Sequence, residues 1–201
     1  MKIAITGGIG SGKSTVLKIL NELGEKTISF DDVYKSLLLD ENFIKGVYFT
    51  VGINQDYKND KPFFNPRKIS EAVFSSPDKL KALNAFAHAK VFEKAFDEGA
   101  LLEKCGKRVF YEVPLLFEGN YQNRFDKVWV VMRDKNARLI SASLRDNLPV
   151  SEIEKRANNQ FDYESSDLSL HTLIINDGDE ASLKSKVERA IYDLEQSKTK
   201  R

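Results

Sequence analysis

A glycine-rich segment near the start of the chain constrains the fold more than any other feature. Residues Gly7–Ser14 read Gly-Gly-Ile-Gly-Ser-Gly-Lys-Ser, in which two glycines flank four residues and are followed by lysine and serine. The segment lies between a strand-like run, Ile3–Thr6, and a predicted helix, Lys13–Leu23. This arrangement is typical of a loop whose backbone N–H groups surround the phosphates of a nucleotide. The alternative, a glycine-rich turn with an exposed lysine, is disfavoured because strand, helix and Lys-Ser pair all agree.

The positions of this loop have distinct expected roles. Gly10 and Gly12 are the points of closest approach to phosphate, where a Cβ would obstruct the backbone. Lys13 supplies a cation to the β- and γ-phosphates, and the Ser14 hydroxyl is an expected ligand of Mg²⁺. The helix that begins here also presents its positive end to the anion. We expect Mg·ATP to bind along Gly8, Gly10, Ser11, Gly12, Lys13, Ser14 and Thr15.

Short apolar runs alternate with helical patterns along the rest of the chain. Each run reads as a buried parallel strand, so the pattern predicts the α/β class with a five-stranded parallel sheet. The expected strands are Ile3–Thr6, Thr27–Phe30, Val109–Val113, Val128–Met132 and Leu173–Ile175. With 201 residues, of which 41% are hydrophobic, the chain can bury one substantial core.

Two further regions are predicted to be helical. Residues 33–106 form an insertion between the second and third strands, with helical periodicity through Leu80, Leu83, Ala87, Val91 and Ala95, and we expect them to bind the substrate. Residues 135–164 are charged, and we expect them to cover the site as a lid. The core of this single domain is then residues 1–32, 107–134 and 165–201.

The composition argues against some classes of partner. The formal net charge is +1, from 31 basic and 30 acidic side chains, so no overall field draws the chain to nucleic acid or to an anionic membrane. The single cysteine, Cys105, agrees with a reducing compartment, and we expect it to be a partly buried apolar residue. With no leader and no long apolar run, we expect a cytoplasmic, soluble protein, either a monomer or a small homo-oligomer.

The second expected strand runs directly into two aspartates, Asp31 and Asp32. The carboxyl end of a parallel strand beside a phosphate loop is where open α/β sheets bind ligands. Asp31 is therefore the candidate general base, which would orient an attacking hydroxyl and accept its proton. The alternative is that one of these aspartates caps the helix that follows.

Other polar residues are weaker candidates. Arg138 and Arg145 are seven residues apart, so they share a helix face and are candidates to approach phosphate oxygens, although a solvated helix face is the alternative. Glu112 either reaches the Mg²⁺ shell or points away from it. His88 and His171 have no partner pattern that indicates a metal site.

Four segments together resemble the dephospho-CoA kinase family: Thr6–Thr15, Val113–Glu118, Leu83–His88 and Ile174–Gly178. The resemblance spans almost the whole chain and implies a P-loop NTPase fold with an inserted helical CoA-binding region and a lid. It implies transfer of the ATP γ-phosphate to the ribose 3′-hydroxyl of dephospho-CoA. It further implies that Asp31 is the catalytic aspartate, that Arg67 and His88 lie in the acceptor region, that Arg145 belongs to the lid, and that Asn176 lies beside the adenine.

The chain departs from the family pattern at several positions. Ser29 stands where the family has the first aspartate of Asp-x-Asp, and Ala89 replaces the proline of a His-Pro pair. Ser141 aligns with the usual leading lid arginine, for which Arg138 is a candidate substitute one turn earlier. Leu170-His171 replaces the usual Ala-Asp. None of these departures affects Lys13, Ser14 or Asp31.

Two rival functions remain open at this level. One is another small P-loop kinase, acting on a nucleoside monophosphate, gluconate or shikimate, which shares the loop and differs in the inserted region. The other is a regulatory nucleotide switch that hydrolyses slowly. The absence of an evident Asn-Lys-x-Asp stretch counts against a GTPase switch.

Overall fold

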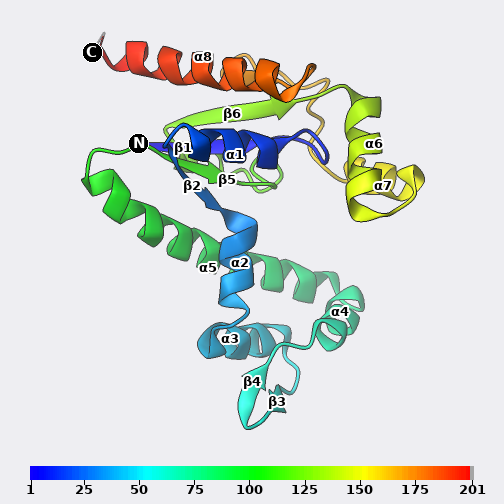
Figure 1. The fold of residues 1–201 in the computed structure, drawn as a ribbon. Helices are drawn as coiled ribbons and strands as arrows, with labels where there is room; N and C mark the ends of the chain where they lie inside the picture. The colour runs from blue at the N-terminus through cyan, green and yellow to red at the C-terminus, as the bar shows by residue number, and fades with distance from the viewer. Residues whose placement is uncertain (200–201) are drawn as a thin grey trace. The chain divides into compact units, whose positions relative to one another are not determined.

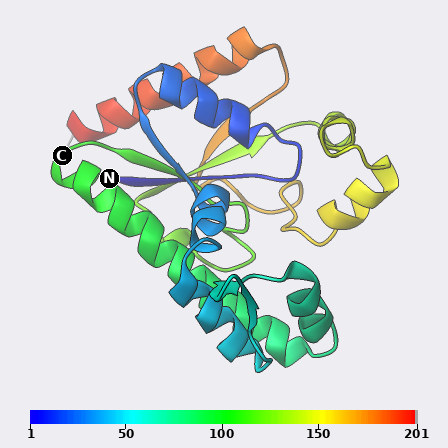
Figure 2. The same cartoon turned by 60° about the horizontal axis from the view of Figure 1, so that its bottom comes forward.

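The computed structural model describes residues 1–199, with side chains up to residue 196. The chain divides into two compact units. The first contains Met1–Thr27 and the chain from Leu102 onward, and the second contains Ile28–Leu101. Figure 1 shows the elements in chain order and Figure 2 shows them in a second view.

A five-stranded sheet forms the centre of the first unit. Its strand order is β2-β5-β1-β6-β7, and the pairings β1–β5, β1–β6 and β6–β7 are parallel. The strands are β1 Lys2–Thr6, β2 Lys26–Ser29, β5 Val109–Glu112, β6 Lys127–Met132 and β7 Thr172–Ile175. The five expected strands agree with these bounds to within one residue at each end, and the α/β class is confirmed.

Two helices cover one face of this sheet. Helix α1 (Lys13–Glu22) and helix α8 (Glu180–Thr199) pack together there (Figures 1 and 2). The apolar core between helices and sheet is formed by Ile3, Ile5, Val16, Ile19, Leu20, Phe110, Trp129, Val131, Ile174, Leu183 and Val187. Strand β1 is central, with Ile3, Ala4 and Ile5 fully buried. The residues that follow β1 therefore emerge from a central, fully buried strand of the sheet.

The lid region contains two helices rather than one continuous section. Helix α6 (Lys135–Asp146) begins at Asp134, whose carboxylate accepts a hydrogen bond from the Ala137 N–H, and ends at Asn147 in the left-handed conformation. Helix α7 (Val150–Ala157) follows Pro149. The region expected to be helical thus holds two helices, separated by the left-handed Asn147 and by Pro149.

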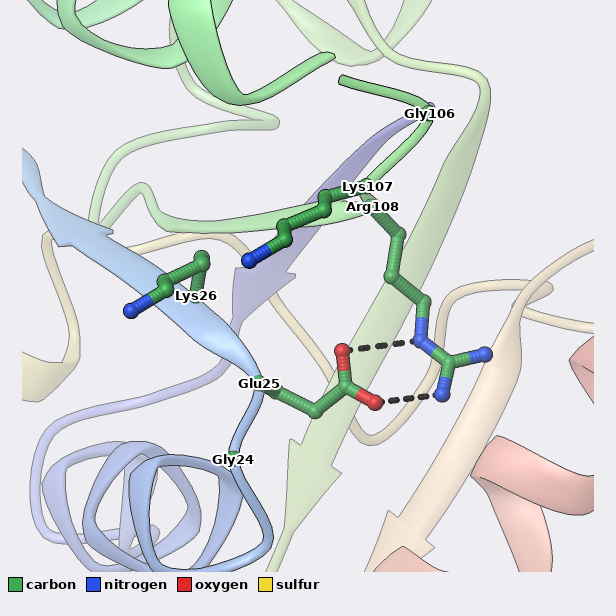
Figure 3. Close-up of a pocket in the computed structure, with 6 residues that line it drawn as sticks. All are labelled: Gly24, Glu25, Lys26, Gly106, Lys107 and Arg108. Atoms are coloured by element: carbon green, nitrogen blue, oxygen red, sulfur yellow. Dashed lines mark hydrogen bonds and ion pairs between the residues drawn. The ribbon is translucent and has the colours of Figure 1, made fainter.

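A paired cation and carboxylate link the starts of β2 and β5. Arg108 donates through its Nε to Glu25 at 2.8 Å and also bonds the second Glu25 oxygen through Nη2. These two residues line a pocket with Gly24, Lys26, Gly106 and Lys107 (Figure 3). Both side chains are largely buried, at 15% and 13% exposure, so this pair stabilises the edge of the sheet.

Helices and one hairpin make up the second unit. These are α2 (Phe30–Leu37), α3 (Glu41–Val51), α4 (Pro66–Phe74) and α5 (Pro77–Lys104), with the hairpin β3 (Asp56–Lys58) and β4 (Lys61–Phe63). The last residues of α5 belong to the first unit. Phe30 packs edge-on against Phe92 with centroids 4.8 Å apart, and Phe43 stacks on Phe86 at 5.6 Å. These aromatic contacts hold α2 and α3 against α5.

The hairpin is an addition to what the sequence predicts. Its two-residue turn, Asn59-Asp60, has positive φ at both positions, which matches the turn type that suits tight hairpins. The expectation for Cys105 is wrong: this thiol is exposed, just beyond the end of α5. No helix in the described part of the chain is both long enough and apolar enough to span a membrane.

Candidate nucleotide-binding site

The glycine-rich loop connects the central strand β1 to helix α1. Gly10 and Gly12 have φ values of 74° and 100°, in the left-handed region that favours glycine. A Cβ on Gly10 would lie 2.0 Å from the carbonyl oxygen of Arg138, and one on Gly12 would lie 2.3 Å from Asn176 Nδ2. Both backbone conformation and neighbouring atoms therefore require glycine at these positions.

The Lys13 side chain folds back onto the loop. Its Nζ donates hydrogen bonds to the carbonyl oxygens of Gly7 at 2.7 Å and Gly8 at 3.2 Å. An ammonium group has three N–H donors, and the loop carbonyls accept from two of them. The loop therefore fixes the direction of the Lys13 side chain. Ser14, one residue along, is exposed in the first turn of α1. The loop thus presents a cation and a hydroxyl at the N-terminus of a helix, which is a favourable setting for phosphate.

Asn176 lies against the loop from the far end of the chain. Its backbone N–H donates to Met132 O at 2.7 Å, which places it directly after β7 at the end of β6. Its side-chain amide donates to Ser11 O at 2.9 Å. The structure therefore brings Asn176 to the loop backbone. That Asn176 lies beside the adenine of bound ATP stays a prediction.

Arg138, in the region expected to form a lid, contacts the loop. Its guanidinium lies beside Gly8, where an added Cβ would be 3.2 Å from Nη1. The same guanidinium pairs with Glu164 at 3.0 Å, and its side chain is 13% exposed. Arg145, by contrast, is 59% exposed and pairs with its neighbour Asp146 at 2.7 Å. Of the two arginines singled out from the sequence, only Arg138 has a recorded contact with the loop.

The segment after α7 contributes two contacts that the sequence did not predict. The Ile9 N–H donates to Gln160 Oε1 at 2.7 Å, and the Tyr163 hydroxyl lies 3.1 Å from Thr6 Oγ1. Desolvation raises the pKa of Tyr163 to about 12, so the phenol is neutral at physiological pH. In the sequence, the two aromatic residues Phe161 and Tyr163 at the end of a charged region are the feature that indicates packing here.

An aromatic cluster fixes that segment. Phe117 lies 4.6 Å from Phe161, 5.9 Å from Tyr163 and 5.3 Å from His171, measured between ring centroids. In addition, the Phe161 N–H donates to Glu118 at 2.8 Å. The Val113–Glu118 segment thus anchors the chain that leaves the lid. His171 has an aromatic packing role here, and burial lowers its pKa.

The remaining sequence candidates lie in the second unit. Asp31 is exposed in the first turn of α2, and Asp32 pairs with Lys35 at 2.8 Å. Ser29 occupies the N-cap position without a side-chain capping hydrogen bond, and both aspartates lie in the first turn, so the capping alternative for the pair is wrong. Arg67 is 89% exposed and pairs with Glu71. His88 is half-buried, which lowers its pKa.

The groups available for a metal are few. Among the described residues, no cluster of three or more His, Cys, Asp or Glu side chains is arranged to hold an ion. Mg²⁺ commonly binds one or two protein oxygens together with water and substrate phosphates, so it does not need such a cluster. The exposed Ser14 hydroxyl fits that mode of binding, and Glu112, half-buried at the end of β5, stays a candidate.

A family model described as dephospho-CoA kinase matches residues 1–182. The chain belongs to the dephospho-CoA kinase family. A dephospho-CoA kinase of Chlorobaculum tepidum is 35% identical over 197 residues, covering 96% of this chain and 94% of the relative. One from Staphylococcus aureus strain Mu50 is 30% identical, covering 95% of this chain and 92% of the relative.

Solved structures agree with this family assignment. Dephospho-CoA kinase from Campylobacter jejuni has a TM-score of 0.70 at 28% identity, covering 98% of this chain and all of the other. A protein from Thermus thermophilus has a TM-score of 0.78 at 27% identity, covering 96% of this chain and 97% of the other. The resemblance inferred from the four sequence segments is confirmed. The chain therefore does not belong to a gluconate kinase or shikimate kinase family, which the sequence alone had left open.

Proposed function

We propose that this chain transfers the γ-phosphate of ATP to the ribose 3′-hydroxyl of dephospho-CoA, giving CoA and ADP. The observation that carries the proposal is the loop Gly7–Ser14, with Lys13 held by the loop carbonyls, in a chain of the dephospho-CoA kinase family. The cytoplasm supplies ATP, and we propose it as the location of the reaction.

The ATP half of the proposed site is the loop and its neighbours. Backbone N–H groups of Gly8 to Thr15 would surround the phosphates, and Lys13 would neutralise charge on the β- and γ-phosphates. Asn176, already bonded to the loop backbone, would lie beside the adenine. Mg²⁺, when bound to Ser14 and to the phosphates, would supply further charge neutralisation during transfer.

The acceptor half of the proposed site draws on the second unit. Asp31 would orient the 3′-hydroxyl, and Arg67 and His88 would bind the acceptor. In the transfer, the 3′-oxygen forms a bond to the γ-phosphorus while the bond to the oxygen bridging the β- and γ-phosphates breaks. The hydroxyl proton passes to the Asp31 carboxylate, and ADP leaves. Asp31 is exposed and one residue from the Asp32–Lys35 pair, so its carboxylate has access to a ligand.

The lid would complete the site. We propose that Arg145 exchanges its bond to Asp146 for phosphate oxygens when the lid closes, joining Arg138, which already lies against Gly8. Closure would exclude water and so favour transfer to the acceptor over hydrolysis. The exposed position of Arg145 is consistent with such an exchange, because an exposed ion pair is weak.

The decisive experiment measures ADP release from purified protein with Mg·ATP and dephospho-CoA. Parallel reactions would contain a nucleoside monophosphate, gluconate or shikimate in place of dephospho-CoA. We expect ADP production only with dephospho-CoA, with CoA detected by mass spectrometry. Turnover with another acceptor would replace the proposed substrate, and slow hydrolysis unaffected by any acceptor would support a nucleotide switch.

A further inference from the structure

A buried phenol contacts the point where β1 becomes the phosphate loop. Tyr163 is 6% exposed, and its hydroxyl lies 3.1 Å from the hydroxyl of Thr6, the fully buried last residue of β1. Thr6 is joined directly to Gly7, the first residue of the loop. One side chain from residues 135–164 thus holds the residue that immediately precedes the loop.

The opposite side of Gly7 is also constrained. A Cβ on this residue would lie 2.3 Å from the Val131 carbonyl oxygen and 2.8 Å from Ser11 Oγ. The backbone of β6 therefore packs directly against Gly7. Since Tyr163 holds the adjoining Thr6 and β6 closes the space beside Gly7, the position of Gly7 depends on the phenol as well as on the sheet.

Gly7 in turn orients the lysine of the loop. Its carbonyl oxygen accepts a hydrogen bond of 2.7 Å from Lys13 Nζ, the shorter of the two loop contacts of that ammonium. A displacement of Gly7 moves this acceptor and with it the direction in which the ammonium points. A continuous series thus runs from the Tyr163 hydroxyl through Thr6 and the adjoining Gly7 to Lys13.

The ring of Tyr163 is itself fixed by neighbouring aromatic rings. Its centroid lies 5.1 Å from that of Phe161 and 5.9 Å from that of Phe117. Phe117 belongs to the segment after β5, so the phenol is positioned from a second part of the first unit. Replacing Tyr163 by phenylalanine would keep this packing and remove only the hydroxyl.

We infer that Tyr163 is a positioning residue for phosphoryl transfer, which acts through Thr6 and the adjoining Gly7 to orient Lys13 towards the ATP phosphates. This inference rests on the proposed function. Tyr163 is not part of the phosphate-loop motif. It also connects the lid region to the loop by a contact that does not involve an arginine.

The first test compares two buried phenols. Tyr163→Phe should lower kcat about fivefold, since a hydrogen bond that orients Lys13 is lost, while the KM for dephospho-CoA stays within about twofold. Tyr111→Phe is the matched control, because Tyr111 is fully buried on β5 and its hydroxyl bonds Glu103 at 3.1 Å, away from the loop. Equal kinetic effects in both variants would overturn the inference.

The second test asks whether Tyr163 acts through Lys13. Dissociation constants for Mg·ATP would be measured for Tyr163→Phe, Lys13→Ala and the double variant. We expect Tyr163→Phe to weaken binding about fivefold alone and less than about twofold when Lys13 is already alanine. Equal weakening in both backgrounds would show that the phenol does not act through the lysine.

The two proposals fail in distinguishable ways. If wild-type protein binds Mg·ATP but does not phosphorylate dephospho-CoA, the proposed function fails, while the binding cycle still decides the role of Tyr163. Thermal unfolding would show whether each variant is folded. Should Tyr163→Phe not fold, Thr6→Val removes the partner hydroxyl at nearly constant side-chain volume and is expected to reduce kcat in the same direction.

Discussion

Asn176 donates a hydrogen bond from its side-chain amide to the carbonyl oxygen of Ser11 across 2.9 Å, although 165 positions separate the two residues in sequence. The same amide occupies the space in which a Cβ on Gly12 would lie. A residue at the end of the last strand thus supports the phosphate loop that follows the first.

Replacing Asn176 tests this support. Asn176→Asp would put a negative charge against the Ser11 carbonyl and near bound phosphates, so we expect the dissociation constant for Mg·ATP to rise about tenfold or more. Asn176→Ala removes only the hydrogen bond and should weaken binding less. Asn42→Asp, at an exposed position of α3, introduces the same charge and is expected to leave ATP binding unchanged. Calorimetric titration would provide all three constants.

The proposed catalytic pair makes two separable predictions. Lys13→Ala should abolish transfer, whereas Asp31→Asn should lower kcat by about 10²-fold or more with nearly unchanged ATP binding. Asp32→Asn is the control, since it makes the same change one residue away at a carboxylate paired with Lys35. Steady-state ADP release would decide the matter. An Asp31→Asn enzyme with full activity would rule out this residue as the base.

The two lid arginines should differ in what they stabilise. Arg138 is largely buried against the loop and paired with Glu164, so Arg138→Ala should lower both the Tm and the kcat. Arg145 is exposed, so Arg145→Ala should lower kcat about tenfold or more without changing the Tm. Arg145→Lys keeps the charge but loses the planar fork and should recover only part of the activity. Unchanged kcat in Arg145→Ala would remove it from the proposed mechanism.

The pair at the start of β2 and β5 should matter for stability. Arg108 bonds both oxygens of Glu25 and also contacts Glu195 at 3.0 Å, and the Glu25 hydrogen bonds raise its pKa. Arg108→Met would leave the Glu25 carboxylate buried without its partner and with little access to water. The free energy of unfolding should therefore fall by about 1–3 kcal/mol. Arg189→Met breaks an exposed pair with Asp193 and should cost less than about 0.5 kcal/mol. Urea denaturation measures both.

His88 predicts a pH dependence of folding. Burial lowers its pKa in the folded protein below the value of about 6.5 in the unfolded chain. The unfolded chain therefore binds more protons, and the free energy of unfolding should fall as pH drops below about 6.5. His88→Gln should reduce the difference in stability between pH 7.5 and pH 5.5, measured by urea denaturation. His171→Gln is the comparison, because burial lowers the pKa of His171 as well. The effects of the two substitutions on the pH dependence of unfolding should add.

Sequence patterns were sufficient for the sheet because buried parallel strands are short apolar runs bounded by polar residues. Helix α1 was predicted from Lys13 to Leu23 and runs from Lys13 to Glu22. The hairpin at 56–63 was not predicted, because its strands are three residues long and do not alternate strongly. The break between α6 and α7 falls at Asn147 and Pro149, residue types that favour a helix end and a helix start.

Site geometry was less accessible from sequence than the fold was. The motif identified the loop residues, but contacts such as Asn176 to Ser11 depend on β6 lying between β1 and β7, which no local pattern reveals. Gln160 and Tyr163 lie outside any helix or strand, so no periodicity indicated their importance. The roles proposed for Asp31, Arg67 and His88 rest on the family resemblance and stay predictions.

The partners of the phosphate loop have a consequence for biosynthesis on the ribosome. The loop precedes in the sequence the groups that contact it, Arg138, Gln160, Tyr163 and Asn176. A nascent chain that ends before Asn176 lacks part of the packing that shapes the loop. We therefore expect such a chain to bind nucleotide less tightly than one that includes Asn176.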